Sequence, residues 1–270
     1  MCGSGRIWAV KNDEDMSSDL TQVSQWLAQA KRVVVFSGAG ISTDSGIPDF
    51  RGPNGLWTRN PLAEKTSTLS YYLNDPEVRK VAWEGRVRNF NGTAQPNGGH
   101  HAIVRIQNVG KLSCVITQNV DGLHQDSGIE EHNVVEVHGT IKYGRCWGCD
   151  DRRPMSEFIA RVIAGDPDPH CELCGGVVKS DAILFEQALV PDVIDRAFDE
   201  AEKCDLLLAV GSTLSVRPAN QLVPRAKAAG ALVVILNGTS THMDAFAHVV
   251  LEGSITPTLE ALVAGAEFPT

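Results

Sequence analysis

The amino-acid sequence predicts an α/β protein with a doubly wound, mainly parallel sheet and a smaller second lobe. Short apolar runs alternate along most of the chain with segments whose apolar residues recur at helical spacing. Two segments interrupt that alternation, and the second contains two close pairs of cysteines. Buried strands that alternate with helices are typical of Rossmann-like sheets covered by helices on both faces, and we interpret the interruptions as insertions that build the added lobe.

The predicted strands are apolar runs at residues 33–36, 114–117, 134–137, 206–210, 232–236 and 249–251. Helical patterns occur at residues 20–30, 100–108, 191–203, 217–229 and 256–263. Ser17, Ser18 and Asp19 are available as caps of the first helix. Ligands of such sheets bind beyond the carboxyl ends of the strands, so the residues that follow each strand are the first candidates for a functional site.

The two interruptions define the predicted domain organisation. Residues 51–96 are rich in proline, asparagine and tryptophan and are expected to form a helical excursion, whereas residues 141–180 hold the cysteine pairs. We expect both segments to form one small lobe, and the large lobe to comprise residues of about 19–50, 97–140 and 181–270. Residues 1–18 carry no periodicity and are predicted to be a flexible N-terminal tail ahead of a single domain at 19–270.

Composition and charge argue against a membrane protein, a secreted protein and a nucleic-acid-binding protein. Hydrophobic residues make up 43% of the chain and charged residues 21%, which is ordinary for a globular domain. No apolar stretch approaches the roughly 20 residues that span a bilayer, and the first residues lack the apolar centre of a signal peptide. We therefore expect a cytoplasmic protein without membrane contact, either a monomer or a weak oligomer. A net charge of -9 argues against nucleic acid as a partner and suits basic peptides.

The cysteines predict a metal site by their spacing. Cys146 and Cys149 form one Cys-x-x-Cys pair, and Cys171 and Cys174 form another. Four thiolates in this pattern suit tetrahedral Zn²⁺, and a full four-cysteine shell leaves no open position for a substrate, so we expect one structural zinc ion. A redox disulfide is the alternative interpretation. A zinc ribbon that binds nucleic acid is a further one, which the acidic charge balance disfavours.

A glycine-rich turn, Gly38-Ala39-Gly40, follows the first predicted strand. Such a turn between a strand and a helix exposes backbone N–H groups to a pyrophosphate. The signal is weak by itself, because Thr43 stands where the usual dinucleotide fingerprint has its third glycine, and a plain tight turn remains an alternative. The loop that follows contains Phe50 and Arg51, which favours a nucleotide site.

Polar residues also end the next two strands. Gln118, Asn119 and Asp121 follow the strand at 114–117. Polar side chains at that position are poor core residues and good ribose ligands. His138 follows the strand at 134–137, and a histidine that opens onto a nucleotide cleft is a candidate general base, although a structural role is the alternative.

Taken together, these motifs resemble the sirtuin family of NAD-dependent protein deacylases, of the bacterial type with a single catalytic domain. They stand in the family's order between residue 20 and about residue 265. The motifs that carry the resemblance are Gly38 to Ser42, Gly46 to Arg51, Gln118 to Asp121, His138-Gly139, the two cysteine pairs, Gly211 to Thr213, and Asn237.

The resemblance implies a set of NAD contacts on the large lobe. The pyrophosphate is expected over the glycine turn, and the adenine near Ile255. The residues expected to bind NAD are Gly38, Ala39, Gly40, Ser42, Asp49, Phe50, Arg51, Trp57, Gln118, Asn119, Val120, Asp121, Gly211, Ser212, Thr213, Asn237, Gly238, Thr239 and Ile255.

The resemblance also implies a reaction in which His138, Asn119 and Asp121 are catalytic. Asn119 is expected to orient the nicotinamide ribose, and Asp121 to hold the nicotinamide carboxamide. The acyl oxygen of an acylated lysine in a protein substrate attacks C1′ as nicotinamide leaves, and His138 acts as general base on a ribose hydroxyl. Expected products are nicotinamide, deacylated lysine and O-acyl-ADP-ribose. An NAD-consuming ADP-ribosyltransferase or NAD glycohydrolase is the alternative, and a catalytically idle NAD-binding module is a third.

Two departures bear on the substrate. A branch of the family that prefers acidic acyl groups carries a Tyr-x-x-Arg pair, and the matching stretch at 83–89 lacks the tyrosine, so acetyl or another uncharged acyl group is expected. The family usually has Phe-Gly-Glu in the loop that pairs with substrate peptide, where this chain has Phe185-Glu186-Gln187. We expect the missing glycine to affect how closely a peptide backbone approaches. Glycine carries no side chain and adopts positive φ freely, whereas Glu186 is expected to do neither.

Overall fold

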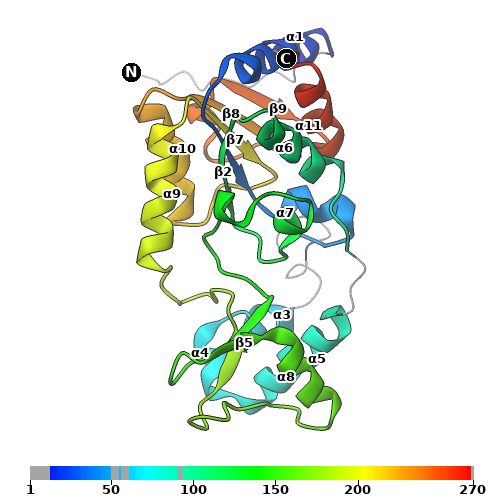
Figure 1. The fold of residues 1–270 in the computed structure, drawn as a ribbon, viewed down its shortest axis with the longest axis vertical. Coiled ribbons are helices and arrows are strands. Elements are labelled where there is room, and N and C mark those ends of the chain that lie inside the picture. The colour runs from blue at the N-terminus through cyan, green and yellow to red at the C-terminus, as the bar shows by residue number, and fades with distance from the viewer. Residues whose placement is uncertain (1–12, 50–54, 56–60, 91–93, 269–270) are drawn as a thin grey trace, which may run out of the picture.

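The computed structural model describes residues 13–49, 55, 61–90 and 94–268. The molecule is elongated and has two lobes (Figure 1). The larger lobe carries the parallel sheet and both described chain ends, and the smaller lobe lies at the opposite end of the long axis.

The large lobe is built on a sheet of six parallel strands in the order β3-β2-β1-β7-β8-β9. Its strands are β1 (Val33–Ser37), β2 (Leu112–Thr117), β3 (Val134–Glu136), β7 (Leu206–Val210), β8 (Leu232–Asn237) and β9 (Val249–Glu252). β1 and β7 are buried along their whole length, as expected for apolar runs covered on both faces. The strand order reverses between β1 and β7, which is where ligands of doubly wound sheets bind. The predicted strands and fold class are confirmed.

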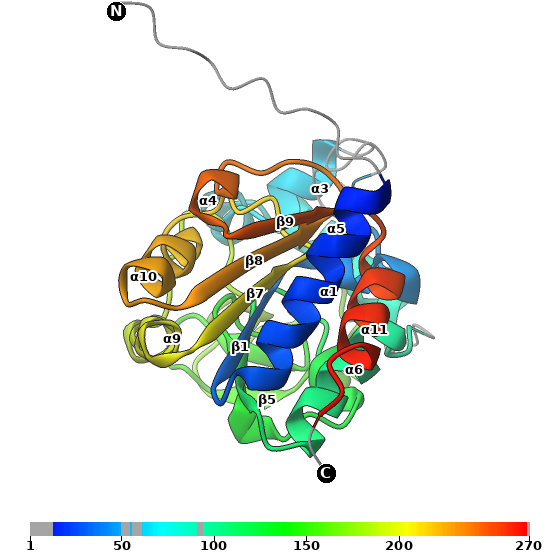
Figure 2. The ribbon, with the colours of Figure 1, turned by 90° about the horizontal axis from the view of Figure 1, so that it is seen from above.

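Helices cover both faces of this sheet (Figure 2). On one face lie α1 (Asp13–Gln29), α6 (Gly98–Asn108) and α11 (Ile255–Ala264). On the other face lie α9 (Pro191–Lys203) and α10 (Leu222–Ala228). Two apolar cores result, one on each side of the sheet, and the odd and even residues of each strand supply them alternately.

Two helix starts differ from the sequence-based expectation. α1 begins at Asp13, so the predicted caps Ser17, Ser18 and Asp19 lie inside the helix. No glycine or proline interrupts residues 13–19, and acidic residues are favourable near a helix N-terminus, so the helix extends further back than the apolar pattern. The helix predicted at 217–229 begins as a 3₁₀ turn at Ala219–Gln221, and its α-helical part starts at Leu222.

The small lobe combines the two segments that interrupt the alternation. The first supplies α3 (Pro61–Thr66), α4 (Leu69–Asn74) and α5 (Pro76–Phe90). The second supplies β4 (Tyr143–Cys146), β5 (Arg152–Pro154), α8 (Met155–Ile163) and β6 (Val178–Ser180), whose strands form an antiparallel sheet in the order β5-β4-β6. Trp83 of α5 is fully buried against Phe158 of α8, with ring centroids 6.0 Å apart, so one small core joins the two segments.

Within the described residues, no helix is both long enough and apolar enough to cross a membrane.

Candidate active site and metal centre

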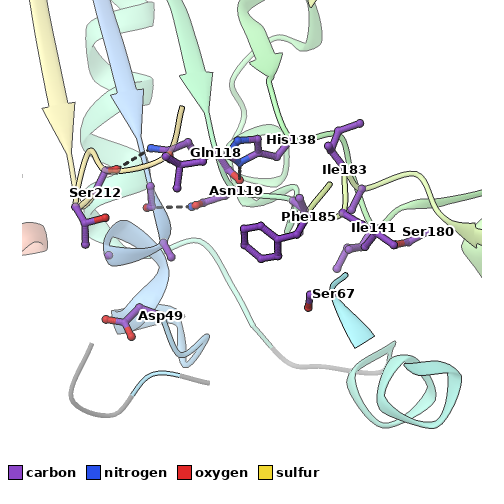
Figure 3. A pocket seen from close by; sticks show the side chains of 18 of the residues that line it. Asp49, Ser67, Gln118, Asn119, His138, Ile141, Ser180, Ile183, Phe185 and Ser212 are labelled. Carbon is purple, nitrogen blue, oxygen red and sulfur yellow. Dashed lines mark hydrogen bonds between the residues drawn. The ribbon is translucent and has the colours of Figure 1, made fainter. Parts of the chain in front are cut away.

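A cavity of about 1010 Å³ opens at the carboxyl ends of the parallel strands and extends toward the small lobe (Figure 3). Most of the residues predicted to bind NAD line it. They are Gly38, Ala39, Gly40, Asp49, Gln118, Asn119, Val120, Gly211, Ser212, Thr213, Asn237, Gly238, Thr239 and Ile255, together with the predicted base His138. Segments far apart in the sequence thus converge on one cavity, because parallel strands end at the same edge of a sheet.

The remaining predicted contacts divide into two groups. Ser42 and Asp121 do not line the cavity and hydrogen-bond to each other, from Ser42 Oγ to Asp121 Oδ2 at 2.8 Å. Phe50, Arg51 and Trp57 lie outside the described residues.

The glycine turn packs against the loop after β7. A Cβ atom on Gly38 would lie 2.7 Å from the Cβ of Ser212, and one on Gly40 would lie 2.8 Å from the Cα of Gly211. The N–H groups of Gly38 and Gly40 donate to the carbonyls of Val210 and Gly211, at 2.9 and 2.8 Å. The two glycines are therefore required by the close approach of two loops. These two N–H groups are therefore engaged within the protein, and the pyrophosphate site over the turn remains a prediction.

Asn119 is held from two sides at the end of β2. Its side-chain amide nitrogen donates to the carbonyl of Gly38 at 3.2 Å and to Ser42 Oγ at 3.1 Å. Both amide hydrogens are thereby used, so the Oδ1 atom is left to accept a hydrogen bond from a ligand. Asn119 is only 7% exposed, and its exposed part faces the cavity (Figure 3).

His138 follows β3 and has a defined tautomer. Its Nδ1 atom lies 3.1 Å from the backbone carbonyl of Gln118, which accepts a hydrogen bond, so the proton of the neutral ring is on Nδ1. The Nε2 atom then carries the lone pair. Burial of the half-buried ring lowers the pKa of His138, while the hydrogen bond to Gln118 opposes that change. A neutral imidazole with a free lone pair beside a cavity is the chemical form of a general base.

Two further contacts fix the rim of the nucleotide side. Gln118 Nε2 donates to Ser212 Oγ at 2.7 Å, which joins the ends of β2 and β7 (Figure 3). Asn237 Nδ2 donates to the carbonyl of Thr239 at 2.8 Å and orders the turn after β8. Ser212 and Asn237 are both buried to about nine tenths, so these side chains hold the loops that line the cavity.

A second arm of the cavity runs between the lobes, and most of its residues were not singled out from the sequence. Ile141, Ile183 and Phe185 provide apolar surface there, opposite Asn119 and His138 (Figure 3). Arg86 of α5 also lines it, and its guanidinium stacks on Trp83 at 4.7 Å from the ring centroid. Ile141 and Ile183 carry no local motif, whereas Phe185 and Arg86 lie in the two stretches that the family resemblance singled out; the docking of the two lobes brings all four together.

The four cysteines of the two pairs form one cluster in the small lobe. Their sulfur atoms all lie within 4.8 Å of one another, with Cys146 and Cys174 at 3.4 Å and Cys149 and Cys171 at 3.6 Å. Tetrahedral zinc thiolates with Zn–S bonds of about 2.3 Å place their sulfurs about 3.8 Å apart, so the cluster fits the ion.

Small residues and a backbone donor complete this metal centre. The N–H of Gly148 donates to Cys146 Sγ at 3.3 Å, as outer-shell groups of zinc thiolates do. A Cβ atom on Gly176 would lie 3.1 Å from the same sulfur. None of the four cysteines lines the cavity at the strand ends, so the zinc would hold the small lobe together and take no part in chemistry there.

The fold and the cavity define a class: an α/β enzyme that binds a dinucleotide at its strand ends and carries a zinc-stabilised lobe. A family model described as "Sir2 family" matches residues 38–218. A curated relative from Streptomyces coelicolor, NAD-dependent protein deacetylase 2, is 44% identical over 233 residues, which are 86% of this chain and 97% of the relative. This chain belongs to the Sir2, or sirtuin, family, as its motifs predicted.

Solved structures agree with this assignment. A structure from work on the mechanism and regulation of Sir2 enzymes has a TM-score of 0.84 and 35% identity, covering 93% of this chain and 98% of that one. A second, of a Sir2 variant with deacetylated p53 peptide and 3′-O-acetyl-ADP-ribose, has a TM-score of 0.82 and 25% identity, covering 93% and 99%. The six-stranded sheet and the four-cysteine lobe are thus features of a known architecture.

Proposed function

We propose that this chain is an NAD-dependent protein-lysine deacetylase in which His138 is the general base and Asn119 orients the nicotinamide ribose. The observation that carries the assignment is the placement of these two side chains. They stand at the ends of neighbouring strands on one cavity, one as a neutral base with its lone pair free and the other with only Oδ1 free. The overall reaction is supported by the curated relative, which is named an NAD-dependent protein deacetylase, and by the Sir2 complex, which holds a deacetylated peptide and 3′-O-acetyl-ADP-ribose.

NAD occupies the large-lobe half of the cavity in this proposal. Bound there, it supplies a ribose carbon that loses nicotinamide and takes up the acyl oxygen of the substrate lysine. The loops at 38–40 and 211–213 form the surface for the pyrophosphate, and Ile255 lies at the adenine end. Ser212 is held by Gln118, so the loop has its shape before the nucleotide arrives.

Asn119 and His138 divide the work on the ribose. Asn119 Oδ1 accepts from a ribose hydroxyl and fixes the sugar. His138 Nε2 removes the proton from a ribose hydroxyl, which then attacks the acyl carbon. The bond from that carbon to the lysine nitrogen breaks, and addition of one water molecule gives O-acetyl-ADP-ribose with free lysine. Because burial lowers the pKa of His138, the ring is neutral at pH 7 and able to accept that proton.

Asp121 contacts Asn119 indirectly, through Ser42. Its Oδ2 atom accepts from Ser42 Oγ at 2.8 Å, and Ser42 Oγ in turn accepts from Asn119 Nδ2 at 3.1 Å. The predicted contact of Asp121 with the nicotinamide carboxamide remains a prediction.

The acylated lysine enters through the arm between the lobes. Ile141, Ile183 and Phe185 line a passage toward Asn119 and His138, which suits a neutral acyl chain such as acetyl. The same arm distinguishes deacylation from the ADP-ribosyltransferase and glycohydrolase alternatives, since neither requires a built passage for an acyl-lysine.

The test is a nicotinamide-release assay with three substrates: NAD alone, NAD with an acetyl-lysine peptide, and NAD with the same peptide carrying unmodified lysine. Deacetylation requires release only with the acetylated peptide, together with O-acetyl-ADP-ribose detected by mass spectrometry. Equal release without peptide identifies a glycohydrolase. Transfer of ADP-ribose to the peptide identifies an ADP-ribosyltransferase, and absence of any release contradicts all three enzymatic assignments.

A further inference from the structure

A group of buried polar side chains lies behind Asn119 and has no part in the reaction described above. Ser37 ends β1, Thr117 ends β2, and His124 lies in the short helix α7 (Leu123–Asp126). Their exposed fractions are 0%, 2% and 1%. Burying polar groups is costly unless they are hydrogen-bonded, so three neighbouring ones call for an explanation from their contacts.

The three side chains form a continuous series of hydrogen bonds that ends on Asn119. His124 Nε2 lies 2.8 Å from Ser37 Oγ, and Ser37 Oγ donates to Thr117 Oγ1 at 2.8 Å. Thr117 Oγ1 also accepts from the backbone N–H of Asn119 at 3.0 Å. Since the Ser37 hydroxyl donates to Thr117, its oxygen accepts from His124, which places the proton of His124 on Nε2.

A second series reaches Asn119 from the opposite side and returns to α7. Asn119 Nδ2 donates to Ser42 Oγ, and Ser42 Oγ donates to Asp121 Oδ2. Asp121 Oδ1 accepts from the backbone N–H of Leu123 at 3.0 Å, and Leu123 precedes His124 in the chain. The two series therefore close into a ring, of which Asn119 is the one side chain that lines the cavity.

We propose that His124 is a positioning residue for the NAD reaction, acting through Ser37 and Thr117 on the backbone of Asn119. This inference rests on the proposed function, because breaking the ring of hydrogen bonds would misplace the ribose that Asn119 holds. A residue displaced by about 1 Å can reduce a rate by about 100-fold, so the buried hydrogen bonds that fix Asn119 are expected to raise kcat.

The surroundings of His124 keep it in the required form. Burial lowers its pKa to about 3, so the ring is neutral and holds one proton, on the nitrogen that faces Ser37. The ring of His100 packs against it with centroids 5.0 Å apart and restricts its orientation. Nδ1 of His124 has no hydrogen-bond partner among the described residues, so the ring is oriented by the bond from Nε2 to Ser37 and by its packing on His100.

The experiment compares three variants and one control, using kcat and KM for NAD in peptide-dependent nicotinamide release, with zinc content and Tm of each protein. Thr117→Val keeps the shape and removes the acceptor for Asn119. His124→Leu removes the donor to Ser37, and His124→Gln retains an N–H donor. Ser24→Ala is the control, because Ser24 of α1 is buried and its hydroxyl donates to the carbonyl of Leu262, outside the ring of hydrogen bonds that holds Asn119.

We expect Thr117→Val and His124→Leu each to lower kcat by about tenfold or more. His124→Gln should stay within about threefold of wild type and the control within about twofold. A fifth protein, which combines Thr117→Val with His124→Leu, should be no worse than the poorer of those two single variants, because both substitutions break the same series of hydrogen bonds. The proposal is overturned if the reductions in kcat multiply in the double variant, or if kcat is unchanged in Thr117→Val. The result for Thr117→Val tests the proposal even if His124→Leu does not fold. A wild-type protein without peptide-dependent release would instead overturn the proposed function.

Discussion

Glu186 accepts a hydrogen bond from the backbone N–H of Ser70 at 3.1 Å while its own backbone is left-handed, with φ 70°. The residue before it is held on the same segment, since Phe185 N donates to the carbonyl of Ser67 and Leu69 N donates to that of Phe185. The expectation that a glutamate in place of glycine forgoes positive φ is therefore wrong. A non-glycine residue at positive φ costs of order 1 kcal/mol, and these hydrogen bonds to the small lobe offset that cost.

This contact gives a prediction for peptide binding. Glu186 lines the arm of the cavity that receives the peptide, and Glu186→Gly removes both the charge and the link to α4. We expect a lower KM for peptides with neutral flanks, a weaker preference for Lys or Arg flanks, and a nearly unchanged KM for NAD. KM values for one neutral and one basic acetyl-peptide check this.

Glu186→Gln is the matched control, because its amide oxygen retains the acceptor for Ser70 and only the charge is lost. It should weaken the preference for basic flanks and leave the KM of the neutral peptide as in wild type. If Glu186→Gly leaves both peptides unchanged, this loop does not select substrates.

His138→Ala should lower deacetylation by about 100-fold or more, the usual scale for a general base. Nicotinamide exchange should fall much less, because cleavage of the glycosidic bond precedes the step that needs the base. Both activities are measured on one preparation, with NAD affinity determined by calorimetry. Equal losses of both, at unchanged NAD affinity, contradict the role assigned to His138.

Cys171→Ser should lower zinc content and Tm together, because in such sites the free energy of metal binding is part of the free energy of folding. Cys204→Ser is the control, since Cys204 is a buried cysteine of the large lobe whose thiol bonds the carbonyl of Ala201. It should keep its zinc. Native protein purified without stoichiometric zinc would contradict the four-cysteine assignment.

Stability should decrease as the pH falls below about 6. Burial lowers the pKa of His100 to about 4 and that of His124 to about 3, from an ordinary value of 6.5. Between those values the unfolded chain binds protons that the folded protein excludes, so each histidine removes about 1.4 kcal/mol per pH unit. Urea midpoints at pH 7, 6 and 5 measure the slope, which should be shallower in His124→Gln. Identical slopes in both proteins would mean that His124 does not contribute.

Acyl preference can be tested with acetyl- and succinyl-lysine peptides of one sequence. The apolar surface of Ile141 and Phe185 leads us to expect a kcat/KM at least about tenfold higher for acetyl. Arg86 is a cation in this arm, and its guanidinium is already engaged with the rings of Trp83 and Tyr72. A higher kcat/KM for succinyl, abolished in Arg86→Met, would contradict the expected neutral preference.

The sequence by itself determined the strands, the polar residues that follow them and the cysteine pairs. Each of these is a local pattern: an apolar run of one strand's length, or two cysteines within four positions. The strand ends then predicted the cavity, because all parallel strands of a doubly wound sheet direct their carboxyl ends to one edge.

Tertiary structure decided what depends on contacts between distant segments. It placed Ser42 and Asp121 behind Asn119, bonded to each other and away from the cavity wall. It also gave Glu186 its partner on α4, 116 positions away in the chain. No local pattern records such pairings, since the free energy that selects them comes from the packing of two loops or two lobes together.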